Sequence, residues 1–362
     1  MHILHILPHL ASGGAERQMF YLSQELIQFG HRVDIAYLYE GNKGLNPTFI
    51  ENANYYQINC NSNYDISILL QLIRLIKFQK PDIVQTWIRQ MDIIGGLAAI
   101  FTKTSWVLRE PNSSKAYPVN WKHLLRLVLA RFVKIIVANS KEGLMYWKHF
   151  YPHKKKVIIS NGVPFQLIEN HTADIKENFT FQINNFILYA GRIEKQKKID
   201  VLIRAMYNLN QTQPLNLIIC GEGNQKRMLE KLITELNLEQ NVFLTGAVSP
   251  ERVFFFMKRA KAFVLLSEYE GFPNVLLEAM VCRCPLIVSD IPAHRFFLNE
   301  NNALWVDQLI PESVAEKIYD IITNHVEATN RAIIARNRIE KWSVQNMARK
   351  YEKLYQWIIQ NN

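Results

Sequence analysis

The sequence predicts an α/β protein made of two Rossmann-like, doubly wound domains, and two observations support this prediction. The chain has 362 residues, of which 49% are hydrophobic, and this suits two domains of about 150–200 residues better than one. Apolar runs of strand length alternate with segments of helical period throughout, as in parallel sheets with crossover helices. Two such sheets in series predict two domains that face each other across a cleft.

The N-terminal domain is expected to comprise residues 1–170. Its short apolar runs predict strands, and the segments of helical period between them predict crossover helices. The expected strands are 2–7, 32–38, 55–58, 82–86, 105–109, 134–138 and 157–160, and the expected helices are 15–29, 64–78, 91–102, 120–132 and 141–150. A polar stretch, Ile168–Asn178, then interrupts the alternation and is the expected linker.

The C-terminal domain is expected to comprise residues 171–342, where the alternation starts again. Its expected strands are 186–190, 215–220, 242–244, 262–266, 285–288 and 303–306, with helices between them. A long helix is expected at about 343–359. We expect the final segment, 343–362, to pack back onto the N-terminal domain.

The positive charge lies mainly in the first half. Residues 1–170 hold 19 Lys and Arg against 11 Asp and Glu, whereas the remainder holds 23 against 21. Such an excess favours an anionic partner. The sequence shows no zinc spacing, helix-turn-helix signal or RNA-binding aromatic motif, so we expect an anionic membrane surface and no nucleic acid.

One segment of this basic half, Trp121–Lys134, has the pattern of an amphipathic helix. Its expected apolar face carries Trp121, Leu124, Leu125, Val128 and Phe132, and its expected edges carry Lys122, Arg126 and Lys134. A helix of this kind can lie in a membrane interface. An ordinary domain helix with its apolar side on the sheet has the same pattern, so both interpretations stay open.

The four cysteines and the N-terminus indicate a cytoplasmic location. The closest pair, Cys282 and Cys284, has neither a metal-ligand spacing nor the framework of a secreted scaffold. The N-terminus lacks the basic region and cleavage site of a signal peptide. The longest apolar runs, such as Ile93–Phe101, are shorter than the roughly 20 residues that a bilayer needs.

Three glycine-containing turns carry the chemistry. In the first, after the strand at 262–266, Pro273 is expected at the first position of a helix, and the amides near Asn274 and Val275 are expected to form an anion site. Glu270 and Glu278 flank this site, where the paired hydroxyls of a sugar or ribose suit buried carboxylates. A helix cap and a solvated helix face are the plainer interpretation of these two residues.

The second turn, Gly191–Lys197, follows the first strand of the C-terminal domain and carries Arg192 and Lys197. These two cations can stabilise a departing nucleoside diphosphate without a metal. No Asp-x-Asp sequence occurs in the chain, so we expect no metal and no cofactor. The third turn contains Gly13, Gly14 and Glu16, where the backbone can approach a ligand closely at a helix N-terminus.

The spacing of Glu270 and Glu278, with the turn residues between them, resembles the signature of retaining glycosyltransferases of the GT-B fold, especially family 4. The resemblance covers nearly the whole chain and implies that Glu270 contacts the donor sugar while Glu278 holds the ribose. It implies catalytic roles for Arg192, Lys197 and Glu270. The implied donor-binding residues are Gly13, Gly14, Gly191, Gly221, Gly271, Phe272, Pro273, Asn274, Val275 and Glu278.

The chain also departs from the family pattern. Lys198 stands where relatives usually have glycine, so the backbone there is expected to differ. No histidine occurs in the stretches where many relatives place one near the donor sugar, so Arg109 and Glu110, with Glu16, become candidates for sugar or acceptor contact. Residues Pro292–Arg295 replace a glycine-rich loop that usually ends in Glu, which leaves the donor sugar unspecified.

The expected function is therefore the transfer of a sugar from a UDP- or GDP-sugar to a lipid-linked or saccharide acceptor, for a surface glycan of the lipopolysaccharide type. The resemblance implies retention of configuration. Two alternatives remain from the sequence: a catalytically silent nucleotide-sugar-binding subunit, and a nucleotide-sugar epimerase of the same fold. The epimerase would require acid and base groups at the sugar, and the sequence offers no such set.

Overall fold

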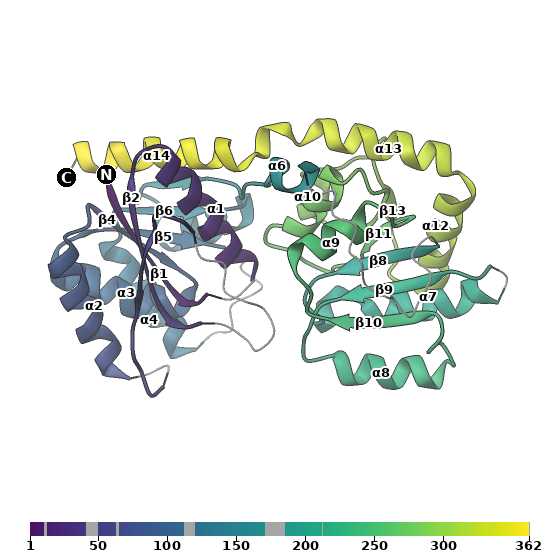
Figure 1. The fold of residues 1–362 in the computed structure, drawn as a ribbon. Helices are drawn as coiled ribbons and strands as arrows, with labels where there is room; N and C mark the ends of the chain where they lie inside the picture. The colour runs from purple at the N-terminus through teal and green to yellow at the C-terminus, as the bar shows by residue number, and fades with distance from the viewer. Residues whose placement is uncertain are drawn as a thin grey trace. The chain divides into compact units, whose positions relative to one another are not determined.

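The computed structural model describes residues 1–10, 13–40, 50–62, 65–111, 120–170, 185–211 and 213–361. The chain forms two compact units: an N-terminal unit of Met1–Gly162 with Trp342–Asn362, and a C-terminal unit of Val163–Lys341 (Figure 1). Residues 171–178 of the expected linker lie outside the described part, whereas Phe165–Asn170 forms helix α6 in the C-terminal unit. No helix among the described residues is long and apolar enough to span a bilayer.

The N-terminal unit contains a parallel sheet with the order β3-β2-β1-β4-β5-β6-β7. In chain order, its strands are β1 (His2–His9), β2 (Arg32–Tyr39), β3 (Asn54–Gln57), β4 (Ile83–Trp87), β5 (Ser105–Glu110), β6 (Ile135–Ala138) and β7 (Lys156–Ile158). The direction of winding reverses between β1 and β4, which lie side by side in parallel register. This is the strand order of a Rossmann-like domain, as the sequence predicts.

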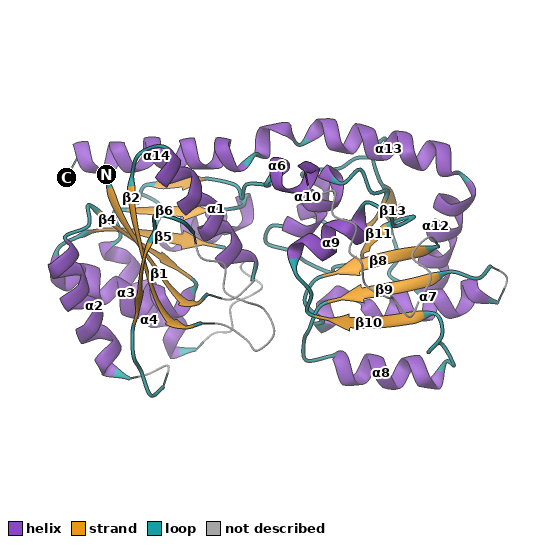
Figure 2. Ribbon diagram, in the orientation of Figure 1, coloured by secondary structure: helices purple, strands orange, loops and turns teal. Residues whose placement is uncertain are grey.

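Helices cover both faces of this sheet (Figure 2). They are α1 (Gly14–Gln28), α2 (Ile66–Gln79), α3 (Arg89–Thr102), α4 (Trp121–Leu129), α5 (Lys141–Phe150) and α14 (Val344–Gln360), with a 3-10 turn, η2, at Ala130–Phe132. Several begin at side-chain caps: Asp65 accepts from the Ser67 N–H, and Ser343 accepts from the Asn346 N–H. Separate apolar clusters fill the two faces, one with α1 and α14, the other with α2 and α3.

The C-terminal unit repeats this topology. Its parallel sheet has the order β10-β9-β8-β11-β12-β13. The strands are β8 (Phe186–Ala190), β9 (Asn216–Cys220), β10 (Val242–Gly246), β11 (Phe263–Leu265), β12 (Leu286–Ser289) and β13 (Leu304–Val306). Most of these strand residues are buried and apolar, as expected where helices cover both faces of a parallel sheet.

The helices of the C-terminal unit follow its strands in alternation. They are α7 (Ile199–Asn210), α8 (Lys226–Glu235), α9 (Pro250–Met257), α10 (Asn274–Val281), α11 (Pro292–Arg295), α12 (Pro311–Thr323) and α13 (His325–Arg338), with 3-10 turns η3 (Lys195–Lys197) and η4 (Glu340–Trp342). Winding reverses between β8 and β11, which are paired through Leu188 and Phe263. In such sheets ligands bind beyond the carboxyl ends of the strands at this reversal.

Candidate active site

The loops that follow β8 and β11 meet at the carboxyl edge of the C-terminal sheet. The Glu268 N–H donates to the carbonyl oxygen of Gln196 over 2.9 Å, and Lys198 Nζ lies 2.9 Å from Glu268 Oε1. The first loop carries Arg192 and Lys197, and the second carries Glu270. The fold therefore brings two of the three sequence motifs to the place where ligands bind in this topology.

Lys197 and Glu270 form an ion pair across these two loops. Their side chains are only 10% and 13% exposed, and the Lys197 ammonium donates to Glu270 Oε1. The Ser267 hydroxyl donates to the same oxygen over 2.8 Å. A carboxylate that is held by a cation and a hydroxyl at the edge of a ligand site has a defined position. From this position it can accept hydrogen bonds from the hydroxyl groups of a ligand.

Arg192 lies on the outer side of the same loop. Its side chain is 73% exposed, and its guanidinium is 2.7 Å from Glu194. The backbone beside it is fixed, because the Tyr189 hydroxyl donates to the Arg192 carbonyl over 2.8 Å. Lys198 adopts a left-handed conformation, with φ 51° and ψ 40°, which favours glycine.

Glycines at the ends of neighbouring strands let their loops pack closely. Gly191 and Gly221 have φ values of 148° and 147°. A Cβ on Gly221 would overlap the Gly191 carbonyl oxygen, and a Cβ on Gly223 would overlap the Ile193 carbonyl oxygen. The strand ends therefore present bare backbone at this edge, as close approach to a phosphate or a base requires.

Helix α10 begins beyond Glu270, one residue later than expected. Pro273 precedes the helix instead of taking its first position, and the Asn274 N–H donates to the Phe272 carbonyl over 3.0 Å. The Asn274 amide is therefore bonded within this turn instead of open, and the expected anion site near Asn274 and Val275 stays a prediction. The Phe272 ring packs edge-on against Phe297, with centroids 5.2 Å apart. Glu278 lies in α10 and is 4% exposed.

The third motif opens α1 in the N-terminal unit. Gly13 precedes the helix in an extended conformation, Gly14 is its first residue, and Glu16 is 9% exposed. The Glu16 carboxylate folds back over Gly13, where an added Cβ would overlap it. The helix N-terminus that suits an anionic ligand thus already has a carboxylate beside it.

Arg109 and Glu110 end β5 and are buried in the N-terminal unit. Arg109 donates from Nε to the Tyr351 hydroxyl over 3.0 Å, and its guanidinium lies 4.5 Å from the centre of the Trp87 ring. Glu110 accepts from Trp147 Nε1 over 3.0 Å. The structure gives both charged groups partners within the unit, and their contact with sugar or acceptor stays a prediction.

Arg126 corrects the expected edge of the amphipathic segment. It is fully buried, with Nε 2.8 Å from Asp92 and one terminal nitrogen 2.9 Å from Glu110. Burial raises the pKa of Asp92 to about 6, although the Arg126 charge opposes this rise. The prediction that Arg126 lies at the exposed edge of the helix is wrong. Helical spacing alone cannot distinguish an exposed cation from one that neutralises buried carboxylates.

Four of the five residues of the expected apolar face of that segment are exposed. Trp121, Leu124, Val128 and Phe132 are 66%, 62%, 54% and 60% exposed, whereas Leu125 packs against the core. An ordinary domain helix would bury most of its apolar face, so this arrangement leaves a surface that needs another explanation.

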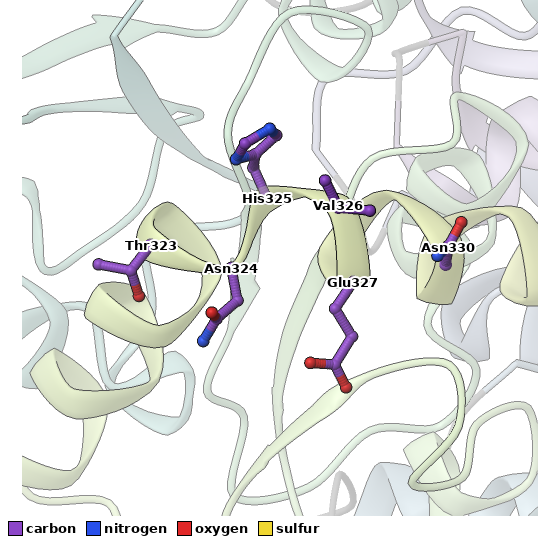
Figure 3. Close-up of a pocket in the computed structure, with 6 residues that line it drawn as sticks. All are labelled: Thr323, Asn324, His325, Val326, Glu327 and Asn330. Carbon is purple, nitrogen blue, oxygen red and sulfur yellow. The ribbon is translucent and has the colours of Figure 1, made fainter.

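A shallow hollow of about 330 Å³ lies elsewhere, at the junction of α12 and α13 (Figure 3). Thr323, Asn324, His325, Val326, Glu327 and Asn330 line it. None of the sequence-predicted site residues borders this hollow. Strand topology and side-chain chemistry, rather than the hollow, therefore locate the candidate site.

Two family models together match most of the chain. The Glycosyltransferase Family 4 model matches residues 12–167, and the Glycosyl transferases group 1 model matches residues 171–339. An uncharacterized glycosyltransferase of Methanocaldococcus jannaschii is 30% identical over 214 residues, 56% of this chain and 54% of that protein. This chain spans about half the length of the curated relatives that it matches first.

A relative from Campylobacter jejuni matches over a longer stretch, 78% of both chains, at 26% identity. Its name describes an α-1,4-N-acetyl-D-galactosaminyltransferase acting on an undecaprenol-diphosphate-linked saccharide. Among solved structures, Anabaena HepE in complex with UDP and glucose has a TM-score of 0.83 at 16% identity, covering 98% of this chain and 99% of its own. Sucrose-phosphate synthase of Thermosynechococcus elongatus also has a TM-score of 0.83, at 18% identity and 99% coverage of both chains. These likenesses show the GT-B fold.

Proposed function

Since this chain belongs to the GT-B glycosyltransferases of group 1 and family 4, we propose that it transfers a sugar from a UDP- or GDP-sugar to a lipid-linked or saccharide acceptor. The observation that carries the proposal is the Lys197–Glu270 pair at the winding reversal of the C-terminal sheet. This pair supports the proposal, because a lysine can stabilise the charge of a diphosphate and a carboxylate can accept hydrogen bonds from sugar hydroxyls. The Campylobacter relatives, whose names describe undecaprenol-linked acceptors, support the acceptor class.

The proposed reaction retains the donor's anomeric configuration by front-face displacement. The departing diphosphate oxygen accepts the proton of the acceptor hydroxyl while the new glycosidic bond forms on the same face. Arg192, Lys197 and backbone amides stabilise the charge that grows on the diphosphate. In this mechanism Glu270 holds the sugar and Glu278 holds the ribose. Because Arg192 and Lys197 stabilise the charge on the diphosphate, the proposed mechanism needs no metal.

One experiment tests the activity. The full chain is screened for thermal stabilisation by UDP, GDP and their hexose conjugates, because a ligand that binds the folded state raises its stability. Release of nucleoside diphosphate and the anomer of any transferred sugar are then measured with and without EDTA. Binding without release would support the silent subunit. An inverted product or a strict need for a divalent metal would contradict the mechanism, and no stabilisation by any nucleotide would contradict the proposal.

We further propose that the transferase works at an anionic membrane, through a surface formed by α2, α3, α4 and the adjoining turn η2 that we call the α2–α4 surface. Helix α3 packs against both α2 and α4 in the N-terminal unit. Its exposed large apolar residues are Ile66, Leu70, Phe78, Phe101, Trp121, Leu124, Val128 and Phe132. Such a gathering on a protein surface marks an interaction site.

Charge favours a lipid partner for this surface. The only acidic residue of α2, α3, α4 and η2 is Asp92, which is fully buried against Arg126. Arg74, Lys77 and Arg131, by contrast, are exposed. Apolar side chains among cations, with no exposed carboxylate on α2, α3, α4 or η2, suit a bilayer interface that contains anionic lipids.

A further inference from the structure

A chain of buried hydrogen bonds leads to Glu270 from the neighbouring strand. Ser267 follows β11 and donates to Glu270 Oε1 over 2.8 Å. Ser289, the last residue of β12, donates from its hydroxyl to the Ser267 carbonyl over 2.6 Å. His294 in α11 donates from Nδ1 to the Ser289 carbonyl over 2.9 Å. Glu270 is therefore linked to Ser267 by a side-chain bond, and Ser267 is linked to Ser289 and His294 through bonds to the backbone carbonyls of Ser267 and Ser289.

These three residues are shielded from water. Ser267 and His294 are fully buried, and Ser289 is 2% exposed. A carbonyl oxygen only accepts hydrogen bonds, so its contact with His294 fixes the proton on Nδ1. Burial lowers the pKa of His294 to about 4, which keeps the ring neutral. Among the described residues, His294 Nε2 is a buried acceptor without a partner.

Both protein donors to Glu270 use the same oxygen. Lys197 and Ser267 each bond Oε1, and the described residues provide no hydrogen bond to Oε2. Oε2 of Glu270 is not fully buried, so solvent reaches this oxygen. One carboxylate oxygen is thus anchored to the protein, while the other stays available to a ligand.

We propose that Ser267, Ser289 and His294 form a positioning chain that holds Glu270 Oε1 and directs Oε2 toward the donor sugar. This inference rests on the proposed function, in which Glu270 binds sugar hydroxyls. A glutamate side chain has several rotamers, and a site that fixes one of them beforehand saves ordering entropy when the sugar reaches its reactive position. This positioning chain also gives the segment Pro292–Arg295 a role in the site, although the segment lacks the expected loop carboxylate. The segment supplies His294, which acts through Ser289 and Ser267.

The test uses the full chain and compares variants of this path with matched controls. Ser267→Ala removes the bond from the serine hydroxyl to Glu270, and His294→Leu removes the bond from the imidazole to the Ser289 carbonyl. His294→Asn keeps a side-chain N–H near the place of Nδ1. Ser249→Ala, at the cap of α9, is the control for loss of a hydroxyl away from the site. Thermal unfolding is measured for each variant, so that only folded proteins are compared.

The expected result is a division between turnover and nucleotide binding. Ser267→Ala and His294→Leu should each lower kcat for the best UDP- or GDP-hexose by about tenfold, because a displaced carboxylate misaligns the sugar. The affinity for UDP or GDP alone should stay within about twofold, since Glu270 is assigned to the sugar and not to the nucleotide. His294→Asn should recover most of the lost turnover, and Ser249→Ala should match wild type. Folded Ser267→Ala and His294→Leu proteins with wild-type kcat would overturn the proposal.

A second measurement does not depend on activity. Nitrogen-15 NMR of the wild-type imidazoles at pH 7 should show His294 as the neutral tautomer protonated at Nδ1. A His294 ring protonated at Nε2, or at both nitrogens, would overturn the proposed positioning chain even in an active enzyme. If no nucleotide sugar is turned over by wild type, the proposed function fails. The NMR result still decides whether the chain exists.

Discussion

The Lys197 ammonium bonds the Glu270 carboxylate, so two residues from motifs 73 positions apart act as one unit. Replacing Lys197 by Met leaves a mostly buried carboxylate with only Ser267 as donor. We expect a loss of about 1–3 kcal/mol in the free energy of unfolding of the C-terminal unit, measured in urea, together with reduced turnover. Lys195→Met, which removes an exposed lysine from the same turn, is the matched control. Equal stability of the two variants would show that the pair contributes nothing.

The two glutamates should separate into different kinetic roles. Glu278→Ala is expected to weaken UDP or GDP binding in calorimetry, because Glu278 is assigned to the ribose. Glu270→Ala is expected to lower kcat mainly, because Glu270 is assigned to the sugar. If both variants changed nucleotide affinity and kcat to the same extent, these roles would be misassigned.

Arg192 should matter for rate more than for binding. Its side chain is highly exposed, and within the described part of the chain its one ion pair is with Glu194, so its truncation leaves no buried group unsatisfied. If it stabilises charge that appears as the diphosphate departs, Arg192→Ala should lower kcat by about 100–1,000-fold with a smaller change in KM. Steady-state kinetics would measure both. A change confined to KM would place Arg192 in ground-state binding.

The α2–α4 surface should bind vesicles that contain anionic lipid, and salt should weaken this binding. Charges are screened beyond about 8–10 Å at physiological ionic strength. Lys77→Glu, Lys122→Glu and Arg131→Glu together should abolish co-sedimentation with phosphatidylglycerol vesicles, and serine at Trp121, Leu124 and Phe132 should do the same. Arg204→Glu, Lys231→Glu and Lys261→Glu change the net charge equally in the other unit, so they test for a general charge effect. Vesicle binding that survives both surface variants would leave the surface without this partner.

The buried cluster of Arg126, Asp92 and Glu110 should control the stability of the N-terminal unit. Arg126→Met leaves two buried carboxylates without their cation, and we expect a loss of about 3–5 kcal/mol. The folded-state pKa of Asp92, about 6, is above its ordinary value of 3.8, so the folded state binds the extra proton between these values. Removing Arg126 raises this pKa further. Urea unfolding should therefore show a smaller loss at pH 5 than at pH 7.5, and a loss independent of pH would contradict this account.

The sequence predicted the fold class because strand and helix periods are local. The expected helix at 141–150 coincides with α5, and most strand predictions differ from the structure by one or two residues. The expected amphipathic helix at 120–132 is also present, divided into α4 and η2. Such features depend on neighbours in the chain, and the sequence displays those neighbours directly.

Features that depend on distant partners were not predictable in the same way. Arg126 looked like an edge cation because Asp92 and Glu110, which neutralise it, come from other elements. His294 was visible in the sequence as a departure from the family loop, yet nothing local indicated its bond to Ser289 or the path to Glu270. The Asn274 amide looked open because its bond to the Phe272 carbonyl depends on the tight geometry before α10.

Membership of α14 in the N-terminal unit bears on the order in which the protein is made. During translation a domain can complete its core only after all its residues have left the ribosome. The C-terminal unit is a single stretch, Val163–Lys341, whereas the N-terminal core includes Tyr351, Tyr355 and Ile358 near the end of the chain. All residues of the C-terminal unit therefore leave the ribosome before the N-terminal unit has all of its own. The first unit must wait, with the apolar side of α1 uncovered, until the final helix emerges.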